Sequence, residues 1–506
     1  MKSQSRAAVI GSGVGGLAAA IRLQAQGVPT TIYEKMSSLG GRAHQFSLGE
    51  YKFDSGPTVI TVPACLEDLF NLCGKKMSDY VELESLTPFY RLLWEDGDVF
   101  DYNADSAQLE KQMAKYGESE WQGYLDYIRY AEEVYKRGYL DLSHVNFSSF
   151  WSMMKVAPDL LRLSAQTPIY KTVSKFVKSE RLRQILSFNT LLIGGNPFKV
   201  SSIYSLIHPL EKKFGVHYAK GGMGKVVSSL QKIFEEAGGQ VMLGAEVDRI
   251  KTKNNKIEGL TLTSGKSFDH ETIVCNSDMI EAYGRMLRGD IDGQKQSNRW
   301  KKKHFSMSLF VYYFGTNRDF PGLKHHNIIF GSRYKDLLTD IFDKGIVPED
   351  FSLYLYAPSK NDSSMAPKGC SSFYVLSPVA HLGKSQEEWD SFGPKYRDRV
   401  VAYLEKHYMP GLAQSIQVDK FFTPKDFQTT YNSHNGSAFS IEPRLNQSAY
   451  FRLQNRDKRF KGLFFVGAST HPGAGLPGVI DSAKATTDMI VTQQNPMPYW
   501  KDGLSR

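Results

Sequence analysis

The chain has 506 residues, a formal net charge of +9 and a pI near 9.0, and 41% of its residues are hydrophobic. This length accommodates two or three domains, and the composition is that of a globular protein rather than a disordered or fibrous one. No apolar run approaches the roughly 18 residues that span a bilayer, so we do not expect an integral membrane protein. The positive charge favours binding to anionic surfaces. No nucleic-acid motif accompanies it, so we expect it to contribute to binding of acidic lipid headgroups or to solubility.

The four cysteines and twelve histidines show no metal-binding spacing. Cys65, Cys73, Cys275 and Cys370 form no C-x-x-C pair, and we interpret them as reduced thiols of a cytoplasmic protein. No H-x-x-x-H pair stands near carboxylates, so we expect no metal site.

A βαβ unit opens the chain. The expected strand Ala7–Ile10 runs into a glycine-rich turn, the expected helix Leu17–Gln26 follows, and Val28–Tyr33 is a second expected strand. The turn is G-x-G-x-x-G, with glycines at Gly11, Gly13 and Gly16. This motif predicts a tight turn, close approach of a pyrophosphate to the backbone, and close packing of the helix on the sheet. The helix N-terminus would add free N–H groups and a positive dipole end.

Glu34 ends the second expected strand, roughly twenty residues after the glycines, where a carboxylate accepts hydrogen bonds from a ribose diol. A carboxylate at this position repels a 2′-phosphate, so the pattern favours FAD or NAD over NADP. The alternative is a secretory signal, because Lys2 and Arg6 precede the apolar run. We disfavour it because glycines interrupt the run and no small-residue cleavage pattern follows.

Two more small-residue turns follow, Leu39–Ala43 with the doublet Gly40-Gly41, and Phe53–Thr61. Their closeness to the βαβ unit suggests that their backbone lines an extended cofactor. We expect Gly41 at this site and Arg42 near the pyrophosphate, where its charge supplements the helix dipole. The alternative is a solvated arginine on a surface loop.

The middle of the chain changes character twice. Ser106–Tyr139 is expected to be helical, with Asp105 and Gln108 spaced as a capping box, and its regularly spaced aromatic residues are interpreted as core. Phe147–Leu163 is strongly apolar with Lys155, Asp159 and Arg162 at its edge. It fits either a helix in a membrane interface or a buried helix, and both remain open.

The chain is then expected to return to the cofactor fold, because a βαβ start needs further strands to complete its sheet. Strands are expected at Gln240–Glu246, Ile257–Leu262 and Thr272–Cys275, and Val247 directly after the first is a further candidate cofactor contact. Residues from about 280 to 455 mix strands and helices, as an α+β substrate domain does.

Near the C-terminus, the strand Gly462–Ala468, the glycine-rich loop Ser469–Gly478 and the helix Val479–Thr492 are expected. A nicotinamide enzyme needs its glycine loops within one contiguous domain, whereas an FAD enzyme can close its flavin with a distant strand and helix. A helix beginning near Gly478 would aim its positive end at the flavin, and Gly467 would border it. The alternative is a simple chain reversal.

Several of these blocks carry a family resemblance. Thr470–Gly478, following Phe464–Ala468, resembles the C-terminal signature of the bacterial and fungal type phytoene desaturases. Gly11–Gly16, Gly56–Thr61, Gly194–Phe198 and Gly436–Pro443 resemble blocks of the same family in order, so the similarity covers nearly the whole chain. Val62 departs from the pattern, because members often carry an acidic residue there.

The resemblance implies an FAD-dependent carotenoid desaturase, cytoplasmic and peripherally associated with the membrane. Its substrate would be a C40 hydrocarbon, 15-cis-phytoene, converted stepwise towards all-trans-lycopene, with oxygen or a quinone receiving the electrons. The implied fold is α/β, with a Rossmann-like FAD-binding domain assembled from residues 1–75, 215–280 and 455–495. An α+β substrate domain would comprise residues 80–104 and 281–454, and a helical, membrane-facing region residues 105–214.

A hydrocarbon offers no hydrogen-bonding group, so its binding would depend on an apolar tunnel, at about 25 cal/mol per Å² of apolar area buried. The proton acceptor is unassigned, with Glu442, His208, His434 and water as candidates. Other readings are a C30 desaturase, a carotenoid ketolase or oxygenase, a retinol saturase, an amine oxidase, and a prenyl-binding protein related to GDP dissociation inhibitors that has lost the flavin.

Overall fold

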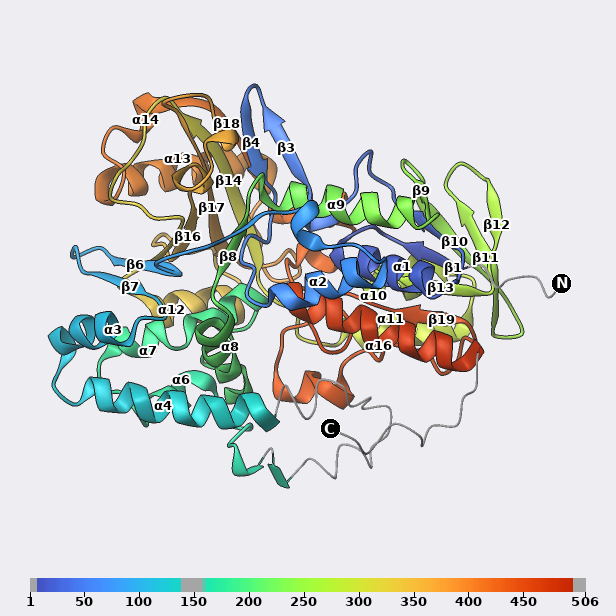
Figure 1. Cartoon of the computed structure of the whole chain (residues 1–506), viewed down its shortest axis with the longest axis horizontal. Coiled ribbons are helices and arrows are strands. Elements are labelled where there is room, and N and C mark those ends of the chain that lie inside the picture. Colours follow the sequence, from blue (N-terminus) through green and yellow to red (C-terminus); the bar gives the residue numbers. More distant parts are fainter. Residues whose placement is uncertain (1–6, 138–157, 160, 495–506) are drawn as a thin grey trace.

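The computed structural model describes residues 7–137, 158–159 and 161–494. Most of the apolar stretch Phe147–Leu163, including Lys155, lies outside the described residues, so its two interpretations remain predictions. Three parts are evident in Figure 1: a half built on a parallel sheet at the right, a half built on a mixed sheet at the upper left, and a group of helices at the lower left.

The right-hand half contains a five-stranded parallel sheet within the described chain, in the order β19-β13-β1-β2-β9. Its strands are β1 (Ala7–Ile10), β2 (Thr30–Tyr33), β9 (Gln240–Met242), β13 (Thr272–Cys275) and β19 (Leu463–Phe465). All residues of β1 are buried, as expected for an uninterrupted apolar strand with layers on both faces of a parallel sheet. Segments separated by more than 400 residues thus form one sheet.

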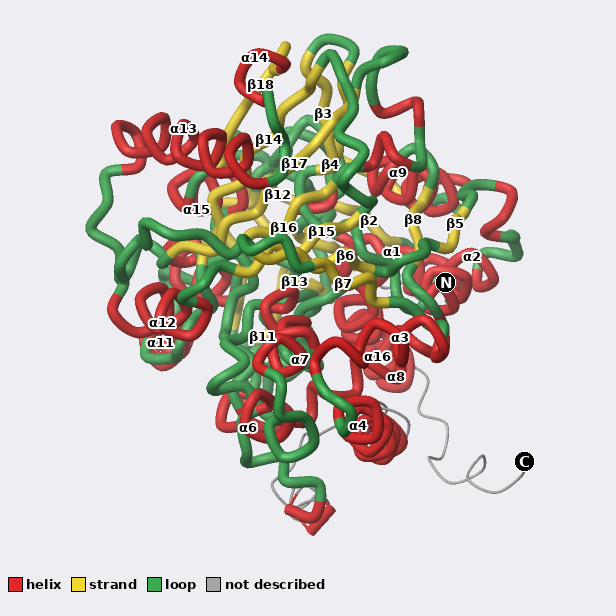
Figure 2. Tube along the Cα trace, turned by 90° about the vertical axis from the view of Figure 1, so that its left-hand side faces the viewer, coloured by secondary structure: helices red, strands yellow, loops and turns green. Residues whose placement is uncertain are grey.

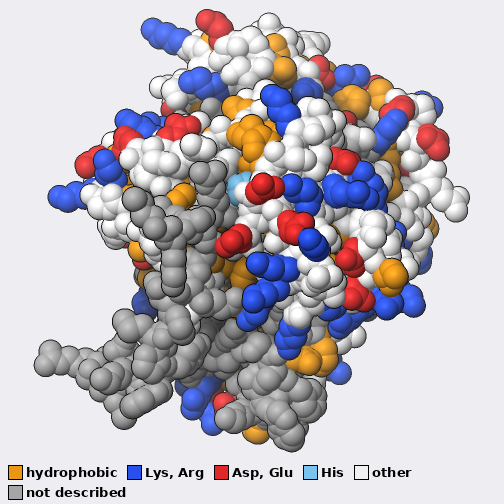
Figure 3. Space-filling model, turned by 90° about the vertical axis from the view of Figure 1, so that its right-hand side faces the viewer, with side chains coloured by type: hydrophobic (Ala, Val, Ile, Leu, Met, Phe, Trp, Pro, Cys, Tyr) orange, Lys and Arg blue, Asp and Glu red, His pale blue; other side chains and the backbone are white. Residues whose placement is uncertain are grey.

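Helices cover one face of this sheet, and a small second sheet covers the other. The helices are α1 (Val14–Ala25), α2 (Pro63–Leu72), α9 (Gly222–Glu236) and α16 (Leu476–Gln494), and they share one apolar core with the sheet. On the other face lie β10 (Val247–Lys253), β11 (Lys256–Leu262), β12 (Ser267–Asp269), α10 (Met279–Glu281) and α11 (Ile291–Lys301). Lys and Arg side chains are interspersed with Asp and Glu on the face at this end of the molecule (Figure 3).

The left-hand half contains a seven-stranded mixed sheet in the described chain, in the order β18-β14-β17-β16-β15-β6-β7. Its strands are β6 (Tyr90–Trp94), β7 (Val99–Tyr102), β14 (Ser308–Thr316), β15 (His326–Phe330), β16 (Leu353–Tyr356), β17 (Ser371–Val379) and β18 (Ile416–Phe422). The early hairpin β6–β7 joins this sheet because β6 pairs in parallel with β15. One face packs on α13 (Trp389–His407) and α14 (Leu412–Ser415).

The other face of the seven-stranded sheet packs on helices, which are spread below it in Figure 2. These are α3 (Ser106–Met113), α4 (Glu120–Tyr135), α6 (Ile169–Val173), α7 (Glu180–Ile185) and α12 (Tyr334–Thr339), and α15 (Pro424–Tyr431) also contributes. Helix α8 (Ile207–Phe214) contacts β6 and β7 through Glu211 and His208. Two short ladders complete the described strands: β3 (Gln45–Leu48) with β4 (Tyr51–Asp54), and β5 (Leu83–Ser85) with β8 (His217–Ala219). No helix within these described ranges combines the length and apolar character needed to cross a membrane.

The helical stretch from Ser106 differs from its expectation in two ways. It is divided into α3 and α4 around Gly117, whose φ of +143° is outside the helical range. The Asp105 side chain does cap α3, accepting from the amides of residues 107 and 108, but the Gln108 side chain bonds Asn103 instead of completing the box. The interpretation of the aromatic residues as core is confirmed for Tyr124, Tyr127 and Tyr135, which are buried. The partly buried aromatic residues pack against the same core, namely Tyr116, Trp121 and Tyr130, and Tyr139 lies outside the described residues.

Candidate functional site

The glycine turn after β1 has the backbone that its sequence demands. Gly11 has a φ of +88°, and its N–H donates to the carbonyl of Tyr33 at 2.9 Å. A Cβ on Gly16 would lie 2.1 Å from the Gly11 carbonyl oxygen. Only glycine therefore allows α1 to start so close to the turn.

Asn276, which sequence reasoning missed, joins this turn to the C-terminal loop. Its amide Nδ2 donates to the Gly11 carbonyl at 3.3 Å. A Cβ on Gly13 would lie 2.9 Å from that Nδ2, and a Cβ on Gly467 would lie 2.4 Å from Oδ1. The available signal was a polar residue directly after the buried strand Thr272–Cys275, at the sheet edge where α/β folds bind ligands.

Glu34 lies under the turn and is 5% exposed. Its Oε2 accepts from the Ser12 amide at 2.8 Å and the Ser12 hydroxyl at 2.6 Å, and Oε1 accepts from the Met36 amide at 2.9 Å. The carboxylate therefore holds the turn in shape. Because each carboxylate oxygen accepts about two hydrogen bonds, capacity for a ribose hydroxyl remains on Oε1.

Val247 is the first residue of β10 and is buried. Its carbonyl accepts from Arg285 Nη2 at 2.9 Å. The Ala245 amide donates to the Glu34 carbonyl at 2.8 Å, so the segment leading into Val247 runs beside Glu34. The contact predicted between Val247 and the cofactor stays a prediction.

The second glycine turn packs on the first. The Gly40 amide donates to the Ser12 carbonyl at 3.2 Å, and a Cβ on Gly41 would lie 3.3 Å from the Gly13 Cα. Arg42 follows directly, with its Nη2 bonded to the Ser433 hydroxyl and its Cζ 5.7 Å from the centre of the Tyr431 ring. Burial lowers the pKa of Arg42.

Two observations make this turn a fitting diphosphate site. No side chain caps α1 at Gly13, which leaves the first amides of the helix for a ligand. Arg42 Nε is buried and has no hydrogen-bond partner among the described residues. A buried guanidinium donor without a partner next to free helix amides suits a doubly charged diphosphate.

The C-terminal loop and α16 approach the same edge of the sheet. Gly467 has a φ of +92°, and a Cβ on Gly478, in the first turn of α16, would lie 2.9 Å from the Gly473 carbonyl oxygen. Helix α16 starts at Leu476, slightly earlier than expected. Buried Arg452 braces the loop by donating to the carbonyls of Thr470 at 3.2 Å and Ala468 at 2.5 Å.

The third small-residue turn, Asp54–Thr58, is attached to the seven-stranded sheet by tyrosine hydroxyls. Their contacts are Tyr313 to the Ser55 carbonyl at 2.8 Å, Tyr374 to the Gly56 carbonyl at 2.6 Å, Tyr354 to the Thr58 hydroxyl at 2.8 Å, and Tyr356 to Asp54 Oδ2 at 3.1 Å. We call the four side chains the aromatic wall: Tyr313, Tyr354, Tyr356 and Tyr374. Burial raises the pKa of Asp54 to about 6, although hydrogen bonds from Gln45, Tyr356 and the start of α9 oppose the rise.

The three candidate proton acceptors lie in different surroundings. His208 on α8 is buried, with Nδ1 3.0 Å from the Tyr102 hydroxyl and Nε2 3.0 Å from the Leu186 carbonyl, and burial lowers its pKa to about 4. His434 is partly buried with its ring centre 4.8 Å from that of Phe305, and burial lowers its pKa. No hydrogen bond joins any two of the three candidates within the described residues.

Glu442 is 1% exposed, and its Oε2 accepts from Arg444 Nε at 2.6 Å. Its Oε1 has no hydrogen-bond partner in the described part of the chain. Burial raises the pKa of Glu442, while the charge of Arg444 opposes the rise. Its partner Arg444 lines an open hollow of about 520 Å³, together with Pro168, Phe198, Lys199, Leu445, Asn446 and Phe451.

Comparisons with known proteins agree over nearly the whole chain. The family of flavin containing amine oxidoreductases matches residues 14–491. The lycopene-forming phytoene desaturase of Pantoea ananas is 48% identical over 483 residues, which cover 96% of this chain and 98% of that protein. The lycopene-forming phytoene desaturase of Pseudescherichia vulneris is 47% identical with the same coverage. The solved structure of cyclohexylamine oxidase from Brevibacterium oxydans shares the fold, with a TM-score of 0.62 and 16% identity over 97% of this chain and 100% of that one.

Proposed function

The chain belongs to the flavin-containing amine oxidoreductases, and within them to the phytoene desaturases, and from this premise we propose that it desaturates 15-cis-phytoene stepwise to all-trans-lycopene. The observation that carries the proposal is the 48% identity over 483 residues, which cover 96% of the chain and 98% of the relative. The protein is an FAD-dependent oxidoreductase.

FAD, when bound, supplies the acceptor for the hydride that leaves the hydrocarbon. The residues that would hold it are the glycine turn and Glu34 at the adenosine end, Gly41 and Arg42 at the diphosphate, and the loop from Gly467 to Gly478 at the flavin end. Asn276 ties these ends together, because it contacts both Gly11 and Gly467. Positioning of the reacting C–H bond beside the cofactor is the main contribution expected from such a site.

The aromatic wall suits a hydrocarbon. The four tyrosines are buried and their hydroxyls are all engaged by the segment Asp54–Thr58, so these side chains offer no unpaired polar group to a hydrocarbon. A substrate without polar groups would gain about 25 cal/mol per Å² of apolar area buried against such a surface. The hollow at Arg444, with Phe198 and Phe451 in its lining, is the entrance we propose for the hydrocarbon.

Among the three candidates, we propose Glu442 as the proton acceptor. Its segment is bonded to the C-terminal loop, since the Ser440 hydroxyl donates to that of Ser469 at 3.1 Å, and its Oε1 is free of partners in the described chain. His208, by contrast, has both ring nitrogens engaged. Glu442→Gln should lower turnover by about 10²-fold with FAD content unchanged, whereas Glu110→Gln on the exposed face of α3 should leave turnover unchanged.

We also propose that the helical part meets an anionic lipid surface, where a membrane quinone or dissolved oxygen receives the electrons. Exposed cations, Lys136, Arg162, Lys171 and Lys175, stand on the segments that flank residues 138–157, and Leu161 is 65% exposed among them. Apolar and basic side chains together are typical of an interfacial surface. Reversing the charge of Arg162 and Lys171 should lower co-sedimentation with anionic liposomes, whereas reversing Lys253 and Lys256 on the β10–β11 hairpin should not.

The proposed activity is tested by expressing the protein in a bacterium that accumulates phytoene and recording the spectrum of the extracted pigment. Formation of lycopene supports the proposal. No pigment from phytoene, together with pigment in a strain that accumulates the C30 precursor, would replace it with a C30 desaturase.

A further inference from the structure

Asp278 stands at the edge of the sheet where the cofactor turn lies. It follows β13, whose Cys275 is opposite Ile10 in the parallel ladder with β1. Residues 276–278 therefore leave the sheet beside Gly11–Gly13, at the carboxyl ends of two adjacent parallel strands. This is the position at which α/β sheets bind their ligands.

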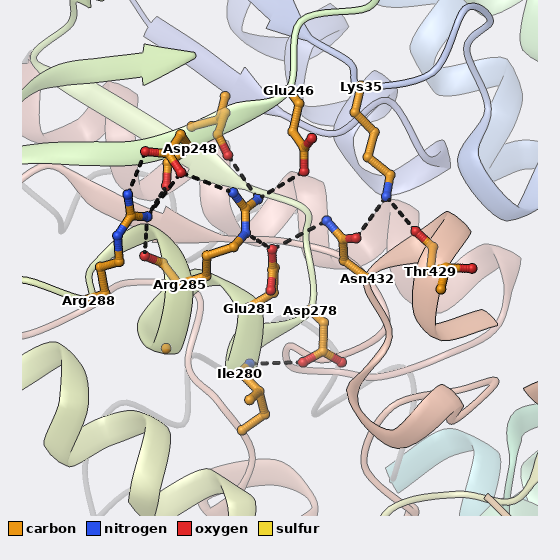
Figure 4. Close-up of polar contacts among 12 residues, drawn as sticks. Lys35, Glu246, Asp248, Asp278, Ile280, Glu281, Arg285, Arg288, Thr429 and Asn432 are labelled. Carbon is orange, nitrogen blue, oxygen red and sulfur yellow. Dashed lines mark hydrogen bonds and ion pairs between the residues drawn. The ribbon is translucent and has the colours of Figure 1, made fainter. Parts of the chain in front are cut away.

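The Asp278 carboxylate is buried, and only one of its two oxygens has a hydrogen-bond partner among the described residues. It is 7% exposed, and its Oδ1 accepts from the Ile280 amide at 2.8 Å, as Figure 4 shows. Its Oδ2 has no hydrogen-bond partner within the described ranges. Burial raises the pKa of Asp278, whereas the nearby amides of residues 280, 281 and 434 and the charge of Arg42 oppose the rise. A buried acceptor without a partner is unfavourable, and a ligand that donates to it would remove that penalty.

Arg42 is the complementary group. Its Nε is also buried without a partner among the described residues. The charges of Arg42 and Asp278 influence each other's pKa, yet no ion pair within 4.0 Å joins them in the described chain. Asp278 thus has a free acceptor and Arg42 a free donor, and the two groups are close enough for each charge to shift the pKa of the other. Arg42 follows Gly41, which packs on Gly13 at the uncapped start of α1.

The surroundings of this pair are fixed by polar contacts between the two halves of the molecule (Figure 4). Lys35 Nζ donates to Asn432 Oδ1 at 2.8 Å and to the Thr429 carbonyl at 3.0 Å. Asn432 Nδ2 donates to Glu281 Oε1 at 3.3 Å, and Glu281 is also bonded to Arg285. The next residue along, Ser433, carries the hydroxyl that holds Arg42, so the guanidinium is held by a braced turn.

We propose that Asp278 is a cofactor-positioning residue: its Oδ2 accepts a hydrogen bond from a hydroxyl of the FAD ribityl chain, and its charge orients Arg42 towards the diphosphate. The proposal rests on FAD occupying the glycine turn. A diphosphate supplies the acceptors that Arg42 lacks, and the adjoining polyol supplies the donor that Asp278 lacks. One ligand therefore satisfies both buried groups.

The competing explanation is that Asp278 merely caps α10. Asp290 offers the matched comparison, since its Oδ1 caps α11 by accepting from the amides of Asp292 at 2.8 Å and Gly293 at 3.2 Å. Asp290 is not buried. Asparagine caps helices about as well as aspartate, so Asp→Asn at either position keeps the cap and removes the charge.

The test is the dissociation constant for FAD, measured by flavin fluorescence on purified full-length protein, for Asp278→Asn, Arg42→Gln, the double variant and Asp290→Asn. Asp278→Asn should raise the constant about tenfold, the size of one lost hydrogen bond to a charged group, and Asp290→Asn should not change it. The double variant should be weaker than wild type by clearly less than the product of the two single effects, because the residues act together.

An unchanged FAD dissociation constant in Asp278→Asn would overturn the proposal. So would a fall in melting temperature of the FAD-depleted chain with no change in that constant, because this is the result of a structural cap alone. No carotenoid is present in the assay. If the variants change FAD binding as expected but the protein does not desaturate phytoene, the proposed function is wrong. The proposed role of Asp278 is then still supported.

Discussion

The two halves of the molecule contribute to the proposed site in different ways. The parallel-sheet half presents backbone, and its essential positions are ones where a single added carbon would collide, as at Gly16 and Gly467. The seven-stranded half presents large side chains, and its tyrosine hydroxyls reach across to the carbonyls of Ser55 and Gly56. Close backbone approach suits a charged cofactor, whereas aromatic faces suit a hydrocarbon.

This difference predicts different sensitivities. In the parallel-sheet half, even the addition of one Cβ atom to a glycine should disturb folding and FAD binding, because the backbone contacts leave no space for it. The substrate half should lose stability in modest steps as single hydroxyls are removed. Substitutions at Gly16, Glu34 and Tyr374 test this contrast, and a further one tests the buried carboxyl of Glu211.

The largest effect is expected for Gly16→Ala. The new Cβ would lie 2.1 Å from the Gly11 carbonyl oxygen, so α1 and the turn would have to separate, at a cost of about 3 kcal/mol or more. We expect little folded protein and no bound FAD by absorbance at 450 nm. Gly322→Ala is the control, since a Cβ there meets nothing within 4 Å. A yellow Gly16→Ala protein with the wild-type melting temperature would contradict the backbone account.

Glu211 on α8 gives the next largest effect, and it depends on pH. It is buried beside Tyr90 and Asn189, and burial raises its pKa to about 8. The folded state therefore keeps a proton that the unfolded state releases above about pH 4.5, so stability falls as pH rises from there to about 8. Glu211→Gln removes this loss.

The measurement is urea unfolding of wild type and Glu211→Gln between pH 5 and pH 9. The two proteins should be similar at the acid end, and the variant should be more stable by roughly 4 kcal/mol near pH 9, at 1.36 kcal/mol per pKa unit between about pH 5 and the folded-state pKa of about 8. A difference that does not change with pH would show that Glu211 is already charged in the folded protein.

Glu34→Ala should weaken FAD binding by about 10- to 100-fold, because it removes both the support of the Ser12 turn and the acceptor for the ribose. Ser12→Ala separates these roles, since it keeps Glu34 and loses only the hydroxyl contacts with Glu34 and with the Gly40 amide, and it should cost about tenfold or less. Flavin content after gel filtration measures both. Fully flavinylated Glu34→Ala protein would contradict the ribose assignment.

The smallest effect is expected for Tyr374→Phe. It removes a hydrogen bond to the Gly56 carbonyl at 2.6 Å and should lower the free energy of unfolding by about 1 kcal/mol, with the FAD dissociation constant nearly unchanged. A loss of FAD as large as that of Glu34→Ala would mean that the aromatic wall takes part in holding the cofactor.

The sequence predicts the cofactor half better than the substrate half because its signals are local. The strand Ala7–Ile10, the three glycines and Glu34 lie within one short segment, and the structure places them together. Asn276 escapes such reasoning, since its role arises only when β13 pairs with β1 and the loop after β19 arrives beside it. The aromatic wall likewise depends on the register of β14, β16 and β17, which no single segment encodes.

Local sequence patterns also give wrong predictions where another contact or turn replaces the expected one. Gln108 has the spacing of a capping box but bonds Asn103 instead. The strand expected over Gln240–Glu246 ends at Met242, because Gly244 turns the chain with a φ of +60°. Of the candidate proton acceptors, His208 has its ring nitrogens engaged, which only the tertiary structure reveals.

The central claim, that an FAD site and a hydrocarbon site share one interface, is tested most directly by anaerobic mixing of the purified yellow protein with 15-cis-phytoene in liposomes. The account predicts loss of flavin absorbance at 450 nm, with one new double bond formed in the carotenoid for each flavin bleached. Flavin that stays oxidised with phytoene but is bleached by a primary amine would contradict it and identify an amine oxidase instead.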